Sequence, residues 1–150
     1  MSKETDFPNL KDEAWQESSP VDASYNCIAF AAGRTDVFWW ADPFAPPLDD
    51  YWPQGIPREE TIEAFIELYR TFGYAPCDLT DDGSLEPGYE KIALYAEGTI
   101  PTHAAKQLPD GRWCSKLGLY EDIEHDNLAC LNGPCYGCPV RFLRRPFSLP

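Results

Sequence analysis

Cys27 and His103 of this 150-residue chain could act together as a nucleophile and its base. Cys27 follows Asn26, a good N-cap, and opens the short apolar run 28–32, so it is expected in the first turn of a helix that stops at Gly33. Free N–H groups and the positive end of the helix dipole favour a thiolate there. His103, one of only two histidines, is a plausible base. The structural alternatives are a buried apolar cysteine and an exposed histidine at a strand end.

The turn at Pro109-Asp110-Gly111 decides which side chain lies beside His103. A one-residue bulge in this turn places His103 and Ser115 on the same face of the predicted hairpin, where Ser115 can orient the imidazole ring. Without the bulge the parity changes, and Lys116 faces the histidine instead. The bulged register, with Ser115 beside His103, is the prediction, and the register with Lys116 is its alternative.

A second group of candidate residues combines one histidine with three cysteines: His125, Cys130, Cys135 and Cys138. Imidazole and thiolate ligands suit tetrahedral zinc, and the last two cysteines have the usual two-residue spacing. The four-residue gaps fit zinc only in part, and a chain of this length can fold without a metal. The prediction is therefore no metal and no other cofactor, with a zinc site at these four residues as the alternative.

The elements that would position these residues follow from periodicity. A helix is predicted from Pro57 to Gly73, because apolar side chains recur there at helical spacing. The tryptophan- and proline-rich segment 35–56 is expected to be a long ordered loop, and 76–88 an acidic surface loop. Alternating or short apolar stretches predict strands over 89–96, 102–108, 112–119 and 140–143.

Helices before antiparallel strands indicate an α+β fold, with N-terminal helices, one of them opening at Cys27, packed on an antiparallel sheet. The composition, 43% hydrophobic and 14% aromatic, excludes an intrinsically disordered chain. Residues 1–22 are expected to form a partly ordered N-terminal arm, and residues 23–150 a single domain.

The net charge of −13 is concentrated in residues 36–97, which hold fourteen acidic and three basic residues. An anionic field disfavours nucleic acid, so a basic protein partner or plain solubility explains this charge better. Neither a secretory signal nor a run of eighteen apolar residues occurs, which predicts a cytoplasmic protein that does not enter membranes. In that compartment the six cysteines are expected to be thiols, a nucleophile or metal ligands.

The order of these motifs resembles the core of papain-like and NlpC/P60-like cysteine peptidases and, more specifically, an uncharacterised bacterial domain family. This resemblance implies a papain-like fold in which Cys27 is the nucleophile, His103 the base and Ser115 the residue that orients the base. It further implies an oxyanion site made by the Cys27 N–H and Asn26. The resemblance rests on Tyr25 to Ala31, His103-Ala104-Ala105, Trp113 with Ser115 to Gly118, and Ile123-Glu124-His125.

The leading prediction is a cysteine hydrolase or acyltransferase, a thiol peptidase or amidase acting on a peptide or protein substrate through Cys27 and His103. Two alternatives stay open. One is a non-enzymatic acidic interaction or inhibitor protein that binds a basic protein through its 36–97 surface. The other is a zinc-stabilised binding module.

Overall fold

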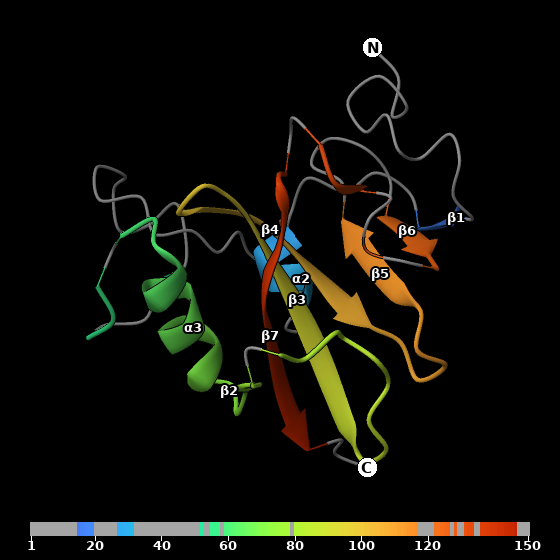
Figure 1. Cartoon of the computed structure of the whole chain (residues 1–150), viewed down its shortest axis with the longest axis horizontal. Helices are drawn as coiled ribbons and strands as arrows, with labels where there is room; N and C mark the ends of the chain where they lie inside the picture. Colours follow the sequence, from blue (N-terminus) through green and yellow to red (C-terminus); the bar gives the residue numbers. More distant parts are fainter. Residues whose placement is uncertain are drawn as a thin grey trace.

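The computed structural model of the protein describes residues 15–19, 27–31, 52, 55–57, 59–78, 80–116, 122–126, 128, 131–133 and 136–146. Within these residues the chain forms two helices and seven strands (Figure 1). In chain order they are β1 (Trp15–Ser19), α2 (Cys27–Ala31), α3 (Ile62–Arg70), β2 (Ala75–Pro76), β3 (Tyr89–Glu97), β4 (Ile100–Gln107), β5 (Trp113–Lys116), β6 (Asp122–His125) and β7 (Cys138–Pro146).

The strands form one antiparallel sheet in the order β1-β6-β5-β4-β3-β7-β2. The β4–β5 hairpin closes through a hydrogen bond from the Leu108 N–H to the Arg112 carbonyl (2.7 Å), with Gly111 at φ +92°. A three-residue turn with a left-handed glycine adds one residue to the returning strand. The bulged register predicted from the sequence is thus confirmed, because Gln107 pairs with Trp113.

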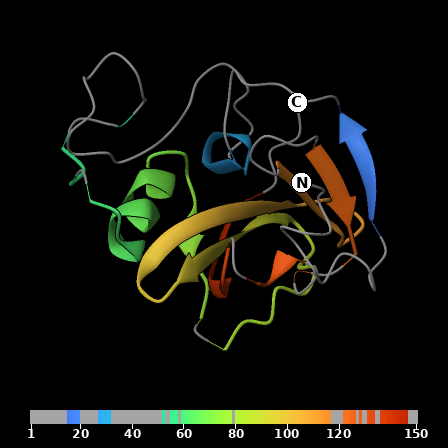
Figure 2. The same cartoon turned by 90° about the horizontal axis from the view of Figure 1, so that it is seen from above.

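Side chains alternate between the two faces of the sheet, and each face has its own apolar cluster. The helix-covered face packs against α2 and α3, which lie on the same side of β3 and β4 in Figure 2. Its strand residues include Ile92, Leu94, Ala104 and Leu143. The opposite face, here called the histidine face because His103 lies on it, includes Ala93, Tyr95, Ala105, Trp113 and Ile123.

Helix α3 begins later than the sequence predicts because its N-cap is Thr61 rather than a residue near Pro57. The Thr61 side chain accepts a hydrogen bond from the Ala64 N–H (3.2 Å) and so satisfies one of the free N–H groups of the first turn. Its apolar stripe packs on the helix-covered face, and the Tyr69 hydroxyl donates to the Ile28 carbonyl of α2 (2.8 Å). This bond ties the two helices together.

The predicted α+β fold of papain-like architecture is wrong, because the described chain is mainly β. Its helices have five and nine residues, and the rest of its regular structure is strand. The prediction failed mainly at β1 and β6, which have few apolar residues of their own. Both are strands because of their pairing: β1 pairs with β6, and β6 also pairs with β5. A strand that is stabilised by partners distant in sequence leaves only a weak local signal.

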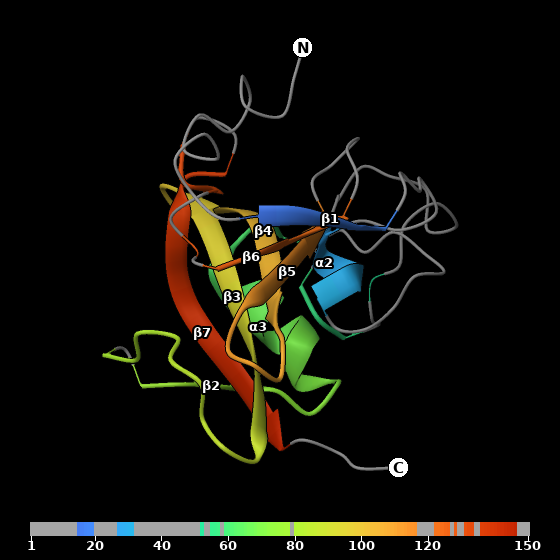
Figure 3. The same ribbon diagram turned by 90° about the vertical axis from the view of Figure 1, so that its right-hand side faces the viewer.

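Two predicted segments are described only in part. Within the predicted N-terminal arm, Trp15–Ser19 is strand β1, which lies beside β6 at the edge of the sheet (Figure 3). Of the predicted loop 35–56, only Trp52, Gly55 and Ile56 lie among the described residues. Trp52 is buried, with its ring 5.3 Å from that of Phe65. Neither helix of the described chain is long and apolar enough to cross a membrane.

Candidate functional site

A buried cluster of three polar side chains lies on the histidine face, one from each of three neighbouring strands. His103 comes from β4, Ser115 from β5 and His125 from β6, and none of the three has solvent-exposed surface. The Ser115 Oγ lies 3.0 Å from the His103 Nε2 and 2.8 Å from the His125 Nε2. One hydroxyl therefore bridges two imidazole rings.

The strand registers explain why these three residues meet. Gln107 pairs with Trp113, so Ser115 lies diagonal to His103 across β4 and β5. Trp113 in turn pairs with His125, so Ser115 lies diagonal to His125 across β5 and β6. The hydrogen bond between Ser115 and His103 follows from the predicted bulge, whereas Lys116, the other option, lies on the helix-covered side.

The single proton of Ser115 sets the direction of the hydrogen bonds. A hydroxyl that contacts two imidazoles donates to one and accepts from the other. The buried Nδ1 of His103 has no hydrogen-bond partner among the described residues. Placing the His103 proton on Nε2 avoids a buried N–H without an acceptor, so we assign His103 as the donor to Ser115 and His125 as the acceptor from it.

Two tyrosine rings enclose His103. The Tyr136 ring is stacked on the imidazole with centroids 4.2 Å apart, and the Tyr95 ring meets it edge to face at 5.1 Å. The Tyr95 hydroxyl donates to the Leu128 carbonyl (2.6 Å). Burial, followed by the nearby His125, holds the pKa of His103 well below its usual value, so the ring is neutral at pH 7.

Cys27 lies on the other side of the sheet. It packs with the apolar cluster of the helix-covered face, and its Sγ lies 4.0 Å from the Thr102 carbonyl oxygen of β4. Burial raises the pKa of the thiol to about 11, outweighing the backbone N–H groups and the Lys116 charge that lower it. The sulfur is therefore a thiol at pH 7, although it stands at a helix start.

The structure consequently does not bring Cys27 and His103 together. The backbone of β4 runs between the thiol on one face and the imidazole on the other, so the geometry of a nucleophile–base dyad is missing. Of the predicted catalytic residues, only His103 and Ser115 are in contact. Asn26, the predicted oxyanion residue, lies outside the described residues.

The alternative zinc ligands are described only in part. His125 belongs to the cluster with Ser115, and Cys138 is exposed at the start of β7. Cys130 and Cys135 lie outside the described residues. Among the residues that the structure does describe, no three His, Cys, Asp or Glu side chains are grouped so as to hold a metal ion.

Sequence reasoning missed the role of His125 as the second histidine of the cluster. The available signal was the alternation of Ile123 and His125, which is typical of a strand with both side chains on one face. Assigning a strand there would have placed His125 beside Ser115.

The described chain is thus a small antiparallel β domain with a buried His–Ser–His cluster on one face of its sheet. A family model described as a domain of unknown function, DUF7689, matches residues 16–144, and the chain belongs to this family. Searches of curated proteins and of solved structures found no match to the chain.

Proposed function

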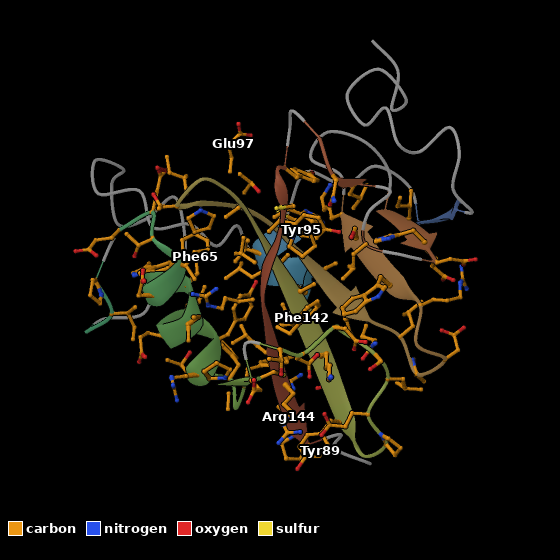
Figure 4. All side chains as sticks on the ribbon, viewed as in Figure 1. Phe65, Tyr89, Tyr95, Glu97, Phe142 and Arg144 are labelled. Atoms are coloured by element: carbon orange, nitrogen blue, oxygen red, sulfur yellow. The ribbon has the colours of Figure 1, made fainter. Side chains whose placement is uncertain are left out.

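We propose that this protein is a non-enzymatic binding domain that recognises a basic protein partner through an acidic surface at the start of α3. This α3 acidic surface consists of four exposed carboxylates: Glu59, Glu60, Glu63 and Glu97. The first three surround the first turn of α3. Glu97 ends β3 where the β3–β4 turn reaches α3 (Figure 1), and its side chain projects outward in Figure 4.

The observation that carries the proposal is the uneven pairing of surface charge. Elsewhere, Arg112 contacts three carboxylates, and Lys91, Arg144 and Arg145 each contact at least one. Within the described residues, no lysine or arginine forms an ion pair with Glu59, Glu63 or Glu97. Like charges gathered on one face attract a cationic partner and steer its approach.

The α3 acidic surface borders a hollow of about 260 Å³ that also offers apolar contact. Its lining includes Ile62 and Val140, and Ile100, the first residue of β4 after the β3–β4 turn, is 51% exposed. Arg141 lines the β7 side of the hollow, and the carboxylate in its lining is Glu63 on the α3 side. This combination suits an arginine or lysine side chain, whose stem is apolar and whose end is charged.

Geometry gives less support to the predicted cysteine hydrolase or acyltransferase. That chemistry requires a thiolate within hydrogen-bond reach of a base, and here the sheet lies between the two groups. A protein partner also fits the net charge of −13 better than a phosphate backbone does. We place the protein in the cytoplasm, since the described Cys27, Cys77 and Cys138 are thiols, as is usual in a reducing compartment.

The experiment is an NMR titration of the protein with a short synthetic peptide in which arginine and leucine alternate. We expect chemical-shift changes to centre on the first turn of α3 and on the β3–β4 turn. The double variant Glu63→Gln, Glu97→Gln should bind about two- to thirtyfold more weakly, because each of the two lost surface contacts contributes about 0.2–1 kcal/mol. Affinity should also fall as salt is raised from about 50 to about 300 mM.

The matched control is the double variant Asp78→Asn, Asp82→Asn, which removes the same charge from another exposed loop. Each asparagine keeps an oxygen that can accept the local hydrogen bonds from Thr80 and Ser84. This control should bind as the native protein does. Equal weakening in both double variants, or shift changes spread over the whole surface, would show a non-specific charge effect and contradict the proposal.

A further inference from the structure

A second hollow, of about 510 Å³, lies at the end of α3 opposite to the α3 acidic surface. The chain turns there from α3 into β2, while β3 and β7 continue further along the sheet (Figure 1). Phe72 and Gly73 line the hollow on the side of this turn, and Glu90, Arg145 and Pro146 line it on the side of the sheet. All five residues are described by the structure.

An ion pair between Glu90 and Arg145 lies on the sheet side of this hollow. The two residues are direct neighbours in the β3–β7 ladder, and the Arg145 Nε donates to the Glu90 Oε1. The Arg145 Nη1 donates to the Phe72 carbonyl (2.8 Å), and the guanidinium carbon lies 4.4 Å from the centroid of the Tyr74 ring. These contacts hold both charged groups in place, as a preformed binding site requires.

Each member of this pair keeps one atom that can bind a ligand. Within the described residues, neither the Arg145 Nη2 nor the Glu90 Oε2 has a hydrogen-bond partner. The described buried polar atoms that lack a partner belong to His103, Gln107 and Asn132, so Nη2 and Oε2 are reached by solvent. The two side chains are only 28% and 15% exposed, so water screens a ligand contact here less than at an open surface.

We propose that this hollow binds a free amino acid that has an apolar side chain. The α-carboxylate of the amino acid accepts from the Arg145 Nη2, and its α-ammonium group donates to the Glu90 Oε2. Both hydrogen bonds join charged groups and are therefore stronger than bonds between neutral groups. The apolar side chain contacts Phe72 and Pro146, which line the same hollow.

The charges of the pair favour a zwitterion over a simple anion or cation. Glu90 repels a ligand that carries only a carboxylate, and Arg145 repels a ligand that carries only an ammonium group. An internal unit of a polypeptide has neither charge, so the pair suits a free amino acid better than a peptide segment. The hollow is also within the range of about 300–1,000 Å³ that is usual for small-molecule sites.

This site is independent of the proposed binding of a basic protein. The two hollows have no lining residue in common, and they lie at opposite ends of α3. Failure of one proposal therefore leaves the other unaffected.

The test is an NMR titration of the full chain with leucine at about pH 6.5, where the α-amino group is protonated. We expect the amide signals of Phe72, Gly73 and Arg145 to shift and to saturate in the millimolar range of leucine. N-acetylleucine lacks the ammonium group, and leucine amide lacks the carboxylate. Each analogue should bind about tenfold or more weakly, because it loses one charge-assisted hydrogen bond.

Glu90→Gln tests the same site from the side of the protein. The variant keeps the size of the side chain but removes its charge, so leucine should bind about tenfold more weakly. The matched control is Glu86→Gln, because Glu86 forms an ion pair with the neighbouring Arg144, whose side chain lies on the other face of β7. This control leaves Glu90 and Arg145 unchanged and should bind leucine as the native protein does.

Three results would overturn the proposal. They are the lack of a saturable shift at the hollow with leucine, an equal affinity for leucine and either analogue, and an equal loss of affinity in Glu90→Gln and Glu86→Gln. If Glu90→Gln does not fold, the comparison of leucine with its two analogues on the native protein still decides.

Discussion

The chemistry of Cys27 depends more on the strand that its sulfur touches than on the helix that it opens. A free helix N-terminus stabilises a thiolate, but this gain is smaller than the cost of burying the charge against β4. A cysteine in this setting behaves as a small apolar side chain.

Cys27 is therefore expected to react slowly with iodoacetamide. With a pKa of about 11 it is almost entirely protonated at pH 7.5, so it should be labelled far more slowly than the exposed Cys138. His103→Ala should not change the rate, because the two side chains lie on opposite faces. Mass spectrometry after limited labelling measures both rates. Fast, His103-dependent labelling of Cys27 would contradict this expectation and restore the hydrolase interpretation.

Ser115 should be the most sensitive polar residue of the described core. Ser115→Ala removes the hydroxyl and leaves the Nε2 atoms of His103 and His125 buried without their shared partner. We expect the free energy of unfolding to fall by about 2–4 kcal/mol, measured by urea unfolding. The control is Ser84→Ala on the exposed loop, which should change it by less than about 0.5 kcal/mol. Similar values for the two variants would show that the bridge contributes little.

At the scale of the element, the position of Tyr136 depends on a close approach between the neighbouring Gly137 and β3. Gly137 has φ +71°, and a Cβ at this position would lie 2.1 Å from the Ala96 carbonyl oxygen. Only glycine allows the two backbones to meet so closely. This contact brings Tyr136 within stacking distance of His103.

Gly137→Ala is accordingly expected to destabilise the protein by about 3 kcal/mol or more, since it adds a clash to an unfavourable backbone conformation. Gly88→Ala is the matched control, because Gly88 has φ +85° but nothing within 4 Å of the added Cβ. That variant should lose only about 1–2 kcal/mol. Thermal unfolding of both variants separates the clash from the dihedral cost, and equal losses would mean that the backbone at Gly137 moves away from β3 without cost.

At the scale of the whole molecule, stability should fall on the acidic side of neutrality. The pKa of His103 is lower in the folded than in the unfolded chain, so its contribution is complete above pH 6.5 and is lost as pH falls toward the folded-state pKa. The limit is about 1.4 kcal/mol per pH unit for one proton. Asp78 and Asp82 have lowered pKa values, so their contribution is lost only below about pH 4.

Urea unfolding at about pH 7.5, 6.5, 5.5 and 4.5 measures this dependence. The loss between pH 6.5 and 5.5 should be smaller in His103→Gln, which cannot take up the proton. Stability that is constant or higher at pH 5.5 in the native protein would contradict the expected direction of the pH dependence.

The sequence determined those features that local chemistry specifies. A cap residue, an apolar stripe and a glycine stop locate helices, so both α2 and α3 were predicted from their residues alone. The Pro109-Asp110-Gly111 turn fixes the β4–β5 register, so the contact of Ser115 with His103 could also be predicted. In both cases the deciding residues lie within a few positions of each other.

Only the tertiary structure decided the rest, because it depends on pairings and packing between distant segments. β1 and β6 are strands since each has a partner, and this pairing brings His125 to Ser115 and makes the protein mainly β. The short apolar run of α2 specifies that the helix is buried, but not which face of the sheet buries it. Packing on the face opposite His103 is what separates Cys27 from the histidine that the sequence paired with it.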